Sequence, residues 1–244
     1  MKTGKWIVID GLDGIGKGEI ERAIIDHESA KGTNIFNLHH YWAEKHEHPT
    51  LNLFNKHQLL ISAEPTRVWT GASIKREIIA NNERKYSTIS TAHAYAVDRL
   101  VLMKMVIHPA LENGINVLQS RSVLSSMIYQ SVQAKENNED LDMHAIMELE
   151  GNKLELENPP YLLIIPVIKN VDELIERLRA REKQDNCQFE TLDFQRKLKP
   201  FYESPEIKEI FEKRGTIVEY VDVGISIEET RRQGLELWKK YMED

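Results

Sequence analysis

Glycines and a lysine follow a short apolar stretch near the N-terminus. The residues Trp6-Ile-Val-Ile-Asp10 run directly into Gly11-Leu-Asp-Gly-Ile-Gly16-Lys17. In this Gly-x4-Gly-Lys spacing, the glycines let backbone N–H groups surround a phosphate chain and Lys17 adds a positive charge. A strand before the glycines and a helix after them predict a loop that binds nucleotide phosphates. A plain Gly-rich turn between strand and helix is the alternative.

The residue after Lys17 differs from the usual pattern of such loops. A Ser or Thr hydroxyl commonly binds Mg²⁺ at this position, whereas this chain has Gly18 followed by Glu19. The Glu19 carboxylate could bind Mg²⁺ directly or repel the phosphates, and the sequence leaves both open.

A second group of polar residues follows another predicted strand, 59–63. Glu64-Pro65 comes directly after it, and ligands of open α/β sheets bind outside the carboxyl ends of strands. Lys75 and Arg76 lie at the predicted start of the next helix, where cations oppose the helix dipole unless an anion lies between them. This favours a phosphate contact over solvated surface charges.

Two further motifs suit recognition of a nucleotide. Tyr95 and Arg99 share one face of a predicted helix, where a ring can stack on a base and a guanidinium can bind its carbonyl edge. A core Tyr beside a salt-bridged Arg99 is the alternative. Arg121 follows predicted strand 115–119 and is a candidate phosphate contact.

A run of cations, Arg177-Leu-Arg179-Ala-Arg181-Glu-Lys183, leads towards Phe189-Glu190. Phosphoryl transfer needs several cations to stabilise the negative charge on the transferred oxygens. The run could close over phosphates or be an ordinary basic helix face.

Apolar runs of strand length alternate with helical patterns along the chain. Most runs are continuous rather than alternating, which is typical of a parallel sheet buried on both faces. The predicted strands are Trp6–Asp10, Asn34–Leu38, Leu59–Ala63, Ile115–Gln119, Tyr161–Val167 and Thr216–Asp222, and the clearest helices are Thr88–Asn113, Val171–Lys183 and Ser226–Met242. We therefore expect an α/β three-layer sandwich around a mainly parallel sheet, with residues 1–244 as a single domain.

Composition limits the classes of function. The chain has 244 residues, 41% of them hydrophobic, and a net charge of −7, which argues against a nucleic-acid partner. Cys187 is the only cysteine, so no internal disulfide can form. The longest apolar run, 161–168, is too short for a membrane span, and the N-terminus reads as a strand. We expect a soluble, cytoplasmic protein.

Two segments lie outside the alternating pattern. The segment His39–His57 holds five of the nine histidines, but their spacing matches no metal-ligand pattern, so we expect a polar loop or surface helix and no metal site. The acidic segment Lys135–Leu156 is expected to be a solvated helix–loop insertion.

Taken in order, these motifs resemble the thymidylate kinase family of P-loop nucleoside-monophosphate kinases. The residues that carry the resemblance are Gly11 to Lys17 with Asp13, Glu64-Pro65, Tyr95 with Arg99, Pro109-Ala-Leu-Glu-Asn-Gly114, Ser120-Arg121-Ser122, Ser125 and Tyr129-Gln130. The family's arginine-rich LID falls near 180–192, and the resemblance leaves 39–57 and 135–156 as insertions.

The resemblance implies transfer of the ATP γ-phosphate to dTMP, with Mg²⁺ as cofactor, in a homodimer. It implies ATP binding by Gly11, Asp13, Gly14, Ile15, Gly16, Lys17, Gly18, Glu19 and Arg179. It implies substrate binding by Glu64, Pro65, Lys75, Arg76, Tyr95, Arg99, Arg121, Ser126 and Tyr129. Tyr95 would stack on thymine and Tyr129 would lie near the deoxyribose. Lys17, Asp13, Arg121 and Arg181 would serve catalysis.

Other functions stay open at this stage. Ser120 and Ser122 replace the outer residues of the family's Asp-Arg-Tyr motif. With Gly18, they leave room for a nucleotide-binding protein with weak or no kinase activity. Glu64-Pro65 with Trp69 and Ser120-Arg121-Ser122 are also similar to deoxynucleoside kinases, in which Glu64 could act as a base towards a hydroxyl acceptor.

Overall fold

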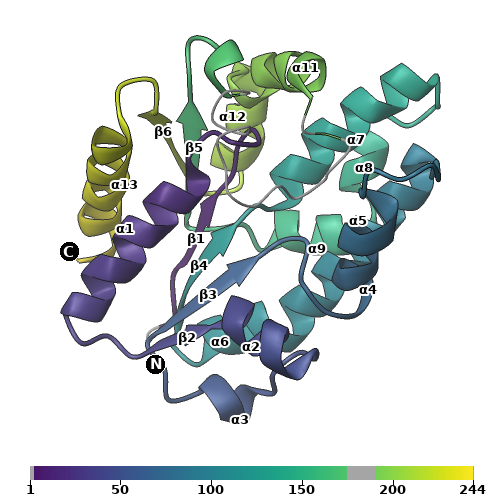
Figure 1. Ribbon diagram of the computed structural model, residues 1–244. Helices are drawn as coiled ribbons and strands as arrows, with labels where there is room; N and C mark the ends of the chain where they lie inside the picture. The colour runs from purple at the N-terminus through teal and green to yellow at the C-terminus, as the bar shows by residue number, and fades with distance from the viewer. Residues whose placement is uncertain (1–2, 175–188, 190, 244) are drawn as a thin grey trace.

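A sheet of six parallel strands forms the centre of the computed structural model, which describes residues 3–174, 189 and 191–243 (Figure 1). The strand order is β2-β3-β4-β1-β5-β6. The strands are β1 (Trp6–Ile9), β2 (Ile35–Asn37), β3 (Leu59–Ala63), β4 (Asn116–Ser120), β5 (Leu162–Val167) and β6 (Ile217–Asp222). The α/β fold with a parallel sheet is confirmed, and each predicted strand lies within one residue of the observed one.

Helices cover both faces of the sheet (Figure 1). The longer ones are α1 (Lys17–Ala30), α5 (Thr88–Leu102), α7 (Val123–Asn137), α11 (Leu192–Tyr202) and α13 (Ile227–Met242), and the shorter ones are α2 (Leu38–Lys45), α3 (Leu51–Phe54), α4 (Trp69–Ser73), α6 (His108–Glu112), α8 (Met143–Met147), α9 (Glu150–Glu157) and α12 (Pro205–Glu212). Helices α1 and α13 pack together on one face, and α5, α7 and α9 lie on the other.

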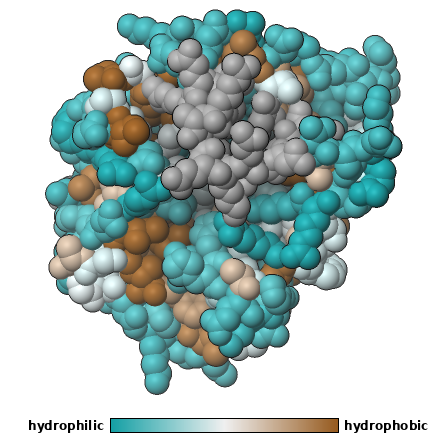
Figure 2. All heavy atoms as spheres, viewed as in Figure 1, coloured by the Kyte–Doolittle hydropathy of each residue, from teal (hydrophilic) through white to brown (hydrophobic). Residues whose placement is uncertain are grey.

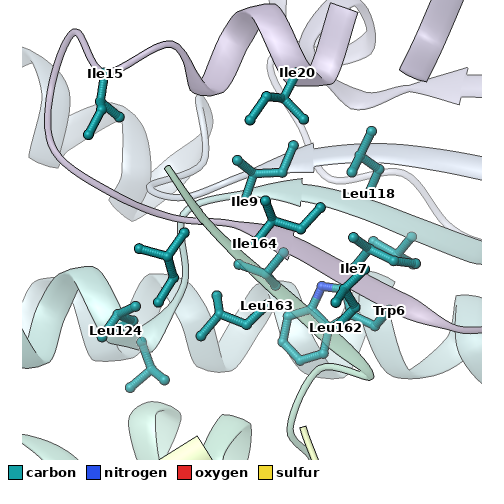
Figure 3. Close-up of a cluster of buried hydrophobic side chains, with 14 of the residues drawn as sticks. Trp6, Ile7, Ile9, Ile15, Ile20, Leu118, Leu124, Leu162, Leu163 and Ile164 are labelled. Carbon is teal, nitrogen blue, oxygen red and sulfur yellow. The ribbon is translucent and has the colours of Figure 1, made fainter. Parts of the chain in front are cut away.

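The core lies between these layers and is built from the central strands. Side chains of β1 and β5 pack with residues of α1, β4 and α7, as the labelled cluster in Figure 3 shows. Ile7, Ile9 and Ile164 are completely buried. Continuous runs of aliphatic residues form these strands because both faces of each are covered by helices.

Polar side chains fix where the helices begin. Asn37, Ser87 and Ser122 each accept a hydrogen bond from a backbone N–H in the first turn of the helix that follows. Ser226 accepts from the Glu229 N–H at 3.1 Å, which confirms the expected start of α13. Such caps satisfy amide groups that have no partner within the helix.

The long predicted helix 88–113 is one continuous helical segment with an internal irregularity. A π-helical turn, η2 (Met103–Ile107), separates α5 from α6. The segment ends before Gly114, which has a φ of 76°. This left-handed conformation suits glycine and agrees with the predicted stop.

The two segments outside the alternating pattern are both largely helical. Residues 39–57 contain the surface helices α2 and α3, and α2 packs against β3. Residues 135–156 are not simply solvated, because α9 packs tightly on α5. A Cβ added to Gly151 would lie 1.8 Å from the carbonyl oxygen of Ala96, so the two helices approach closely.

The surface of the described residues is mostly hydrophilic on the face drawn in Figure 2, with separate hydrophobic patches. None of the helices in the described ranges has the length and apolar character that crossing a membrane requires. The predicted helix 171–183 begins within them, but its residues from 175 onward lie outside the described part of the chain.

Candidate active site

The register of the sheet brings three strand ends together. Ser120 at the end of β4 pairs with Ile9 of β1 and with Ala63 of β3. The ladder continues one residue further, because Glu64 N donates to Ser120 O and Arg121 N donates to Ile9 O, each at 2.9 Å. The motifs after β1, β3 and β4 therefore meet at one edge of the sheet.

The Gly-rich segment after β1 has the backbone of an anion-binding loop. Gly14 and Gly16 have φ values of 75° and 105°, which residues with a Cβ rarely adopt. Gly16 directly precedes α1, so the N–H groups at the start of that helix face the loop. Lys17 Nζ donates to Gly11 O at 2.8 Å and to Leu12 O at 2.6 Å, which places its ammonium group inside the loop.

Asp10, at the end of β1, joins this loop to the motif after β4. Its fully buried carboxylate accepts from Gly11 N, from N and Oγ of Ser122, from N and Oγ of Ser125 and from the Tyr202 hydroxyl. A buried carboxylate is stable only when hydrogen bonds replace its hydration. Ser122 thus has a structural role of its own, as a partner of Asp10.

Asp13 is the point where the loop meets the residues after β4. Its Oδ1 pairs with the guanidinium of Arg121, and its Oδ2 accepts from the Tyr129 hydroxyl at 3.0 Å. Burial disfavours the charge of Arg121, but Asp13, together with Tyr129, Tyr202 and Asp10, raises the pKa of Arg121 above its ordinary value. Burial, and then the Asp13 carboxylate, raise the pKa of Tyr129, so its hydroxyl keeps its proton.

A cavity of about 240 Å³ opens beside this contact. It is lined by Asp13, Glu64, Pro65, Arg67, Lys75, Ile79, Tyr95, Arg121, Ser125, Ser126, Tyr129, Gln130 and Phe189. Eight of the predicted site residues are therefore brought together here: Asp13, Glu64, Pro65, Lys75, Tyr95, Arg121, Ser126 and Tyr129. Aromatic rings, cations and carboxylates in one cavity suit a ligand with a flat ring and a phosphate.

Lys75 and Arg76 do not lie at the start of a helix, contrary to expectation. The helix begins earlier, at Trp69, and continues into the π-helical turn η1 (Ile74–Ile78). Both cations therefore lie near its end, where they complement the helix dipole. Lys75 lines the cavity, whereas Arg76 is exposed and is not among the described lining residues.

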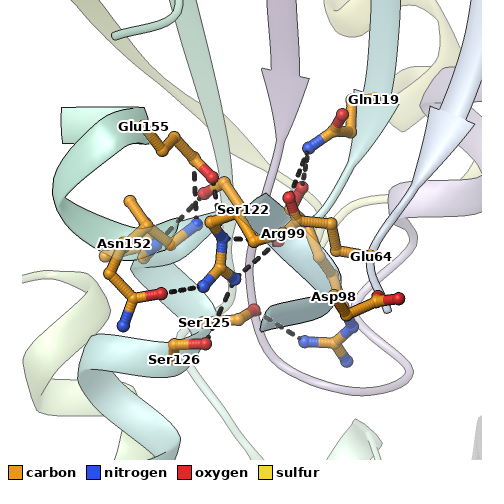
Figure 4. Close-up of polar contacts among 12 residues, drawn as sticks. Glu64, Asp98, Arg99, Gln119, Ser122, Ser125, Ser126, Asn152 and Glu155 are labelled. Atoms are coloured by element: carbon orange, nitrogen blue, oxygen red, sulfur yellow. Dashed lines mark hydrogen bonds and ion pairs between the residues drawn. The ribbon is translucent and has the colours of Figure 1, made fainter. Parts of the chain in front are cut away.

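Arg99 lies behind the wall of the cavity. Its guanidinium donates to Glu64 Oε2 at 2.9 and 2.5 Å, forms an ion pair with Glu155 at 2.8 Å and bonds to Asn152 (Figure 4). Burial raises the pKa of both carboxyl groups, that of Glu155 to about 7. Arg99 reaches the cavity through Ser126, whose Oγ accepts from it at 3.1 Å.

The segment after β3 is fixed by a buried carboxylate. Asp98 accepts from N and Oγ1 of Thr66, each at 2.7 Å. The next residue, Arg67, is exposed and lines the cavity. Trp69 follows with a φ of 44°, unusual for an aromatic residue, and its side chain is 61% exposed.

Glu19 does not face the phosphate loop as a free carboxylate. Its Oε2 accepts from Arg231 of α13 at 2.8 and 2.6 Å, and its Oε1 pairs with Arg22 at 2.9 Å. Gly18 is exposed, and a Cβ added there would meet nothing within 4 Å. Glu19 therefore joins α1 to α13.

Arg179 and Arg181, together with most of the expected LID, lie outside the described residues. Phe189 near its end does line the cavity, and its ring meets that of Tyr129 edge-on at 6.0 Å. Phe189 also stacks on Phe194 of α11 at 5.1 Å.

Sequence reasoning missed several residues of this site. Asp10, Asp98, Gln130 and Gln195 received no role, although all are buried near the cavity. For Asp10 the sequence did hold a local signal of a role in the site, since this carboxylate lies between an apolar strand and the Gly-rich loop. Gln195 had none, because it is 182 residues from its partner Asp13.

Comparisons with known proteins agree with this geometry. The model of the family described as thymidylate kinase matches residues 51–231. The chain belongs to the thymidylate kinase family. That match spans β3 to α13 and includes every wall of the cavity except the phosphate loop.

Individual members of the family align along most of the chain. A thymidylate kinase of Caldicellulosiruptor saccharolyticus is 26% identical over 210 residues, covering 86% of this chain and 85% of its own. One from Ureaplasma parvum is 24% identical and covers 99% and 94%. The solved structure of thymidylate kinase from Candida albicans has a TM-score of 0.62 at 17% identity, covering 98% and 92% of the two chains, which shows a shared fold.

Proposed function

We propose that this family member transfers the γ-phosphoryl group of ATP to dTMP, giving ADP and dTDP. The contact between Asp13 and Arg121 carries the proposal. It joins the loop that would hold the donor phosphates to the cavity that would hold the acceptor. A phosphoryl group can pass between two substrates only if their phosphates meet in line, and these two sites share one wall.

On the donor side, backbone N–H groups of the loop and the start of α1 bind the ATP phosphates. Lys17 now rests on the carbonyl oxygens of Gly11 and Leu12. These neutral acceptors hold the ammonium group in place until the more strongly attractive phosphate oxygens arrive. The structure thus supports Lys17 as a preorganised phosphate contact.

On the acceptor side, cations of the cavity bind the phosphate of dTMP. Arg121 is fixed by Asp13 and by Ser125, whose Oγ accepts from it at 2.9 Å. Lys75 and Arg67 line the same cavity. The acceptor phosphate is already an anionic nucleophile, so no separate base is needed, and catalysis rests on positioning and charge stabilisation.

The thymidine moiety occupies the rest of the cavity. Tyr95 stacks on the base, and Tyr129 lies against the deoxyribose, where its fixed ring leaves little room for a 2′-hydroxyl. Arg99 acts on the base through Ser126 rather than by direct contact. Gln130, 2% exposed, has a side-chain oxygen without a partner in the described residues, and it offers an amide to the base edge.

Mg²⁺, which this family's chemistry implies, would meet one carboxylate of the loop at the cavity, that of Asp13. Gly18 has no hydroxyl and Ser120 has no carboxylate, while Glu19 is paired with Arg22 and Arg231. Asp13, the loop carboxylate at the cavity, is itself paired with Arg121 and Tyr129. It would therefore act on a metal-bound water, while substrate phosphates hold the ion, which usually keeps several of its waters. The ion would neutralise charge on the ATP phosphates. Arg179 and Arg181 would add positive charge from the LID.

A homodimer in the cytoplasm is part of the proposal. Ile89, Val97 and Met105 are 49%, 40% and 46% exposed along α5 and η2. Exposed apolar side chains gathered on one helical segment are typical of an interface. We place the dimer contact on this segment.

An acceptor screen tests the proposed activity. The purified chain is incubated with ATP and Mg²⁺ and with dTMP, dUMP, dCMP or thymidine in turn, and ADP formation is measured. We expect dTMP to be phosphorylated fastest and Lys17→Ala to abolish turnover, with Lys213→Ala, an exposed lysine outside the loop and the cavity, as the control. Phosphorylation of thymidine without dTMP would overturn the proposal, and so would ATP binding without transfer to any acceptor.

A further inference from the structure

A second cavity, larger than the acceptor cavity, lies at the carboxyl ends of β5 and β6, the last two strands in the sheet order. It has a volume of about 450 Å³. Its lining residues come from the ends of β5 and β6, the residues after β5, and the region of α11 and α12, elements that Figure 1 labels. It is lined by Val167, Ile168, Lys169, Lys199, Glu203, Pro205, Lys208, Tyr220 and Asp222. It shares no described lining residue with the acceptor cavity.

The position and surface of this cavity suit a small organic ligand. Val167 and Ile168 lie at the carboxyl end of β5, the side of an open α/β sheet on which ligands bind. With Pro205 and the Tyr220 ring they form a mostly apolar wall. Ligand sites commonly combine such walls with a few polar groups and have volumes of about 300–1,000 Å³.

The charges around the cavity leave one cation uncompensated. Lys199 pairs with Glu203 at 2.6 Å, Lys208 approaches Glu212 at 3.5 Å, and Asp222 accepts from Gly224 N at 2.9 Å. Lys169 is exposed and has no ion pair or hydrogen bond within residues 3–174, 189 and 191–243. Its ammonium group is therefore available to an anion at the rim.

Tyr220 supplies a polar group inside the cavity. Its side chain is half-buried, and its hydroxyl has no hydrogen-bond partner among the described residues. Burial, and then Glu203 and Glu212, raise its pKa, so the hydroxyl stays a donor at neutral pH. A donor beside an apolar wall orients a ligand that carries an acceptor at one end.

We propose that this cavity binds a planar aromatic ligand that carries a single negative charge. The flat body packs between Ile168 and Tyr220, and its anionic group meets Lys169. One uncompensated cation matches one charge, whereas a nucleoside triphosphate would bring several charges to a mainly apolar wall. The site does not depend on the proposed kinase activity.

Binding of a fluorescent probe tests this proposal on the full chain. The probe is 1-anilinonaphthalene-8-sulfonate, and the neutral N-phenyl-1-naphthylamine serves as its uncharged counterpart. We expect saturable binding at one site, at least 5-fold tighter for the sulfonate. Lys169→Gln should remove that preference, and Lys213→Gln, at the exposed end of α12 and outside the cavity lining, should leave it unchanged. Val167→Phe, which fills the cavity, should abolish binding of both probes.

Three results would overturn the proposal. The first is equal affinity for the charged and neutral probes, and the second is binding that is unchanged in both Lys169→Gln and Val167→Phe. The third is displacement of the probe by ATP or dTMP, which would assign the cavity to the substrates. Because Lys169 is exposed, Lys169→Gln keeps the fold and stays informative even if Val167→Phe fails to fold, which circular dichroism would show.

Discussion

The side chain of Gln195 holds Asp13 at two points. Its Oε1 accepts from the Asp13 backbone N–H at 2.9 Å, and its Nε2 donates to Asp13 Oδ2 at 3.3 Å. The same Nε2 donates to the carbonyl oxygen of Phe189 at 2.9 Å. One fully buried amide on α11 therefore fixes the phosphate loop, the cavity wall at Phe189 and, through Asp13, the position of Arg121.

Gln195→Leu is expected to lower kcat by about 10- to 100-fold. Leucine has a similar size but leaves the N–H of Asp13 and the carbonyl of Phe189 without partners, which costs about 1–3 kcal/mol each. Steady-state kinetics and thermal unfolding would measure both effects. Gln233→Leu, which removes a glutamine from α13 away from the cavity, is the control. A kcat equal to that of the unmodified protein would show that Gln195 does not position Asp13.

Arg99→Met is expected to reduce the free energy of unfolding by about 3–5 kcal/mol, because it leaves Glu64 and Glu155 buried without their cation. The double variant Arg99→Met/Glu155→Leu should recover part of the loss. Urea unfolding checks both. If Arg99→Met instead raised KM for dTMP and left stability unchanged, the guanidinium would face the nucleotide and not the carboxylates.

The Arg99 network shows where sequence reasoning stops. The strands could be predicted because Ile7, Ile164 and their neighbours form continuous apolar runs with one structural meaning. The phosphate loop could be predicted because its glycines and Lys17 are adjacent in the chain. The spacing of Tyr95 and Arg99 predicted a shared helix face. The charges that face Arg99, however, come from Glu64 after β3 and from Glu155, 56 positions later in a segment expected to be solvated.

The same limit applies to Lys75 and Glu19. The sequence shows that both residues lie near a predicted helix start. The observed start of α4 at Trp69 and the pairing of Glu19 with Arg231 depend on tertiary packing, which the local sequence does not show. Local patterns fix which residues are near a strand end or a helix start. They do not fix which distant side chain neutralises a charge.

Gly18→Ser is expected to lower the Mg²⁺ concentration for half-maximal activity by about 5- to 10-fold. The backbone at Gly18 is not left-handed and an added Cβ would meet nothing within 4 Å, so the hydroxyl can be accommodated. A new hydrogen-bonding or metal-ligating oxygen contributes about 1 kcal/mol. Gly18→Ala is the matched control, since it removes glycine from the helix without adding an oxygen. Identical Mg²⁺ curves for the Ser and Ala variants would contradict the prediction.

His39→Phe is expected to make the protein less sensitive to acid. Burial, followed by the nearby Arg67, Lys75 and His40, lowers the pKa of His39 from 6.5 to about 4. The unfolded chain therefore binds a proton between about pH 6.5 and 4 that the folded chain excludes, and stability falls as the pH falls through this window. The difference amounts to about 3 kcal/mol.

Urea unfolding at pH 7.5 and pH 4.5 would check the effect of His39. The loss of stability between these values should be smaller in His39→Phe, with His40→Phe, at an exposed neighbouring position, as the control. Burial raises the pKa of Glu21 to about 7, which acts in the opposite direction, so the variants must be compared with the unmodified chain. An equal acid sensitivity in both His variants would contradict the role of His39.

Val97→Glu is expected to convert a dimer into a monomer. Val97 is 40% exposed in the middle of α5, so a carboxylate there leaves the fold intact but would face its own copy across a two-fold axis. Burying such like charges in an interface is strongly unfavourable. Sedimentation velocity at micromolar concentration would measure the change, with Ala30→Glu, at the exposed end of α1, as the control. A monomeric unmodified chain, or a Val97→Glu variant that stays dimeric, would place the interface elsewhere or exclude it.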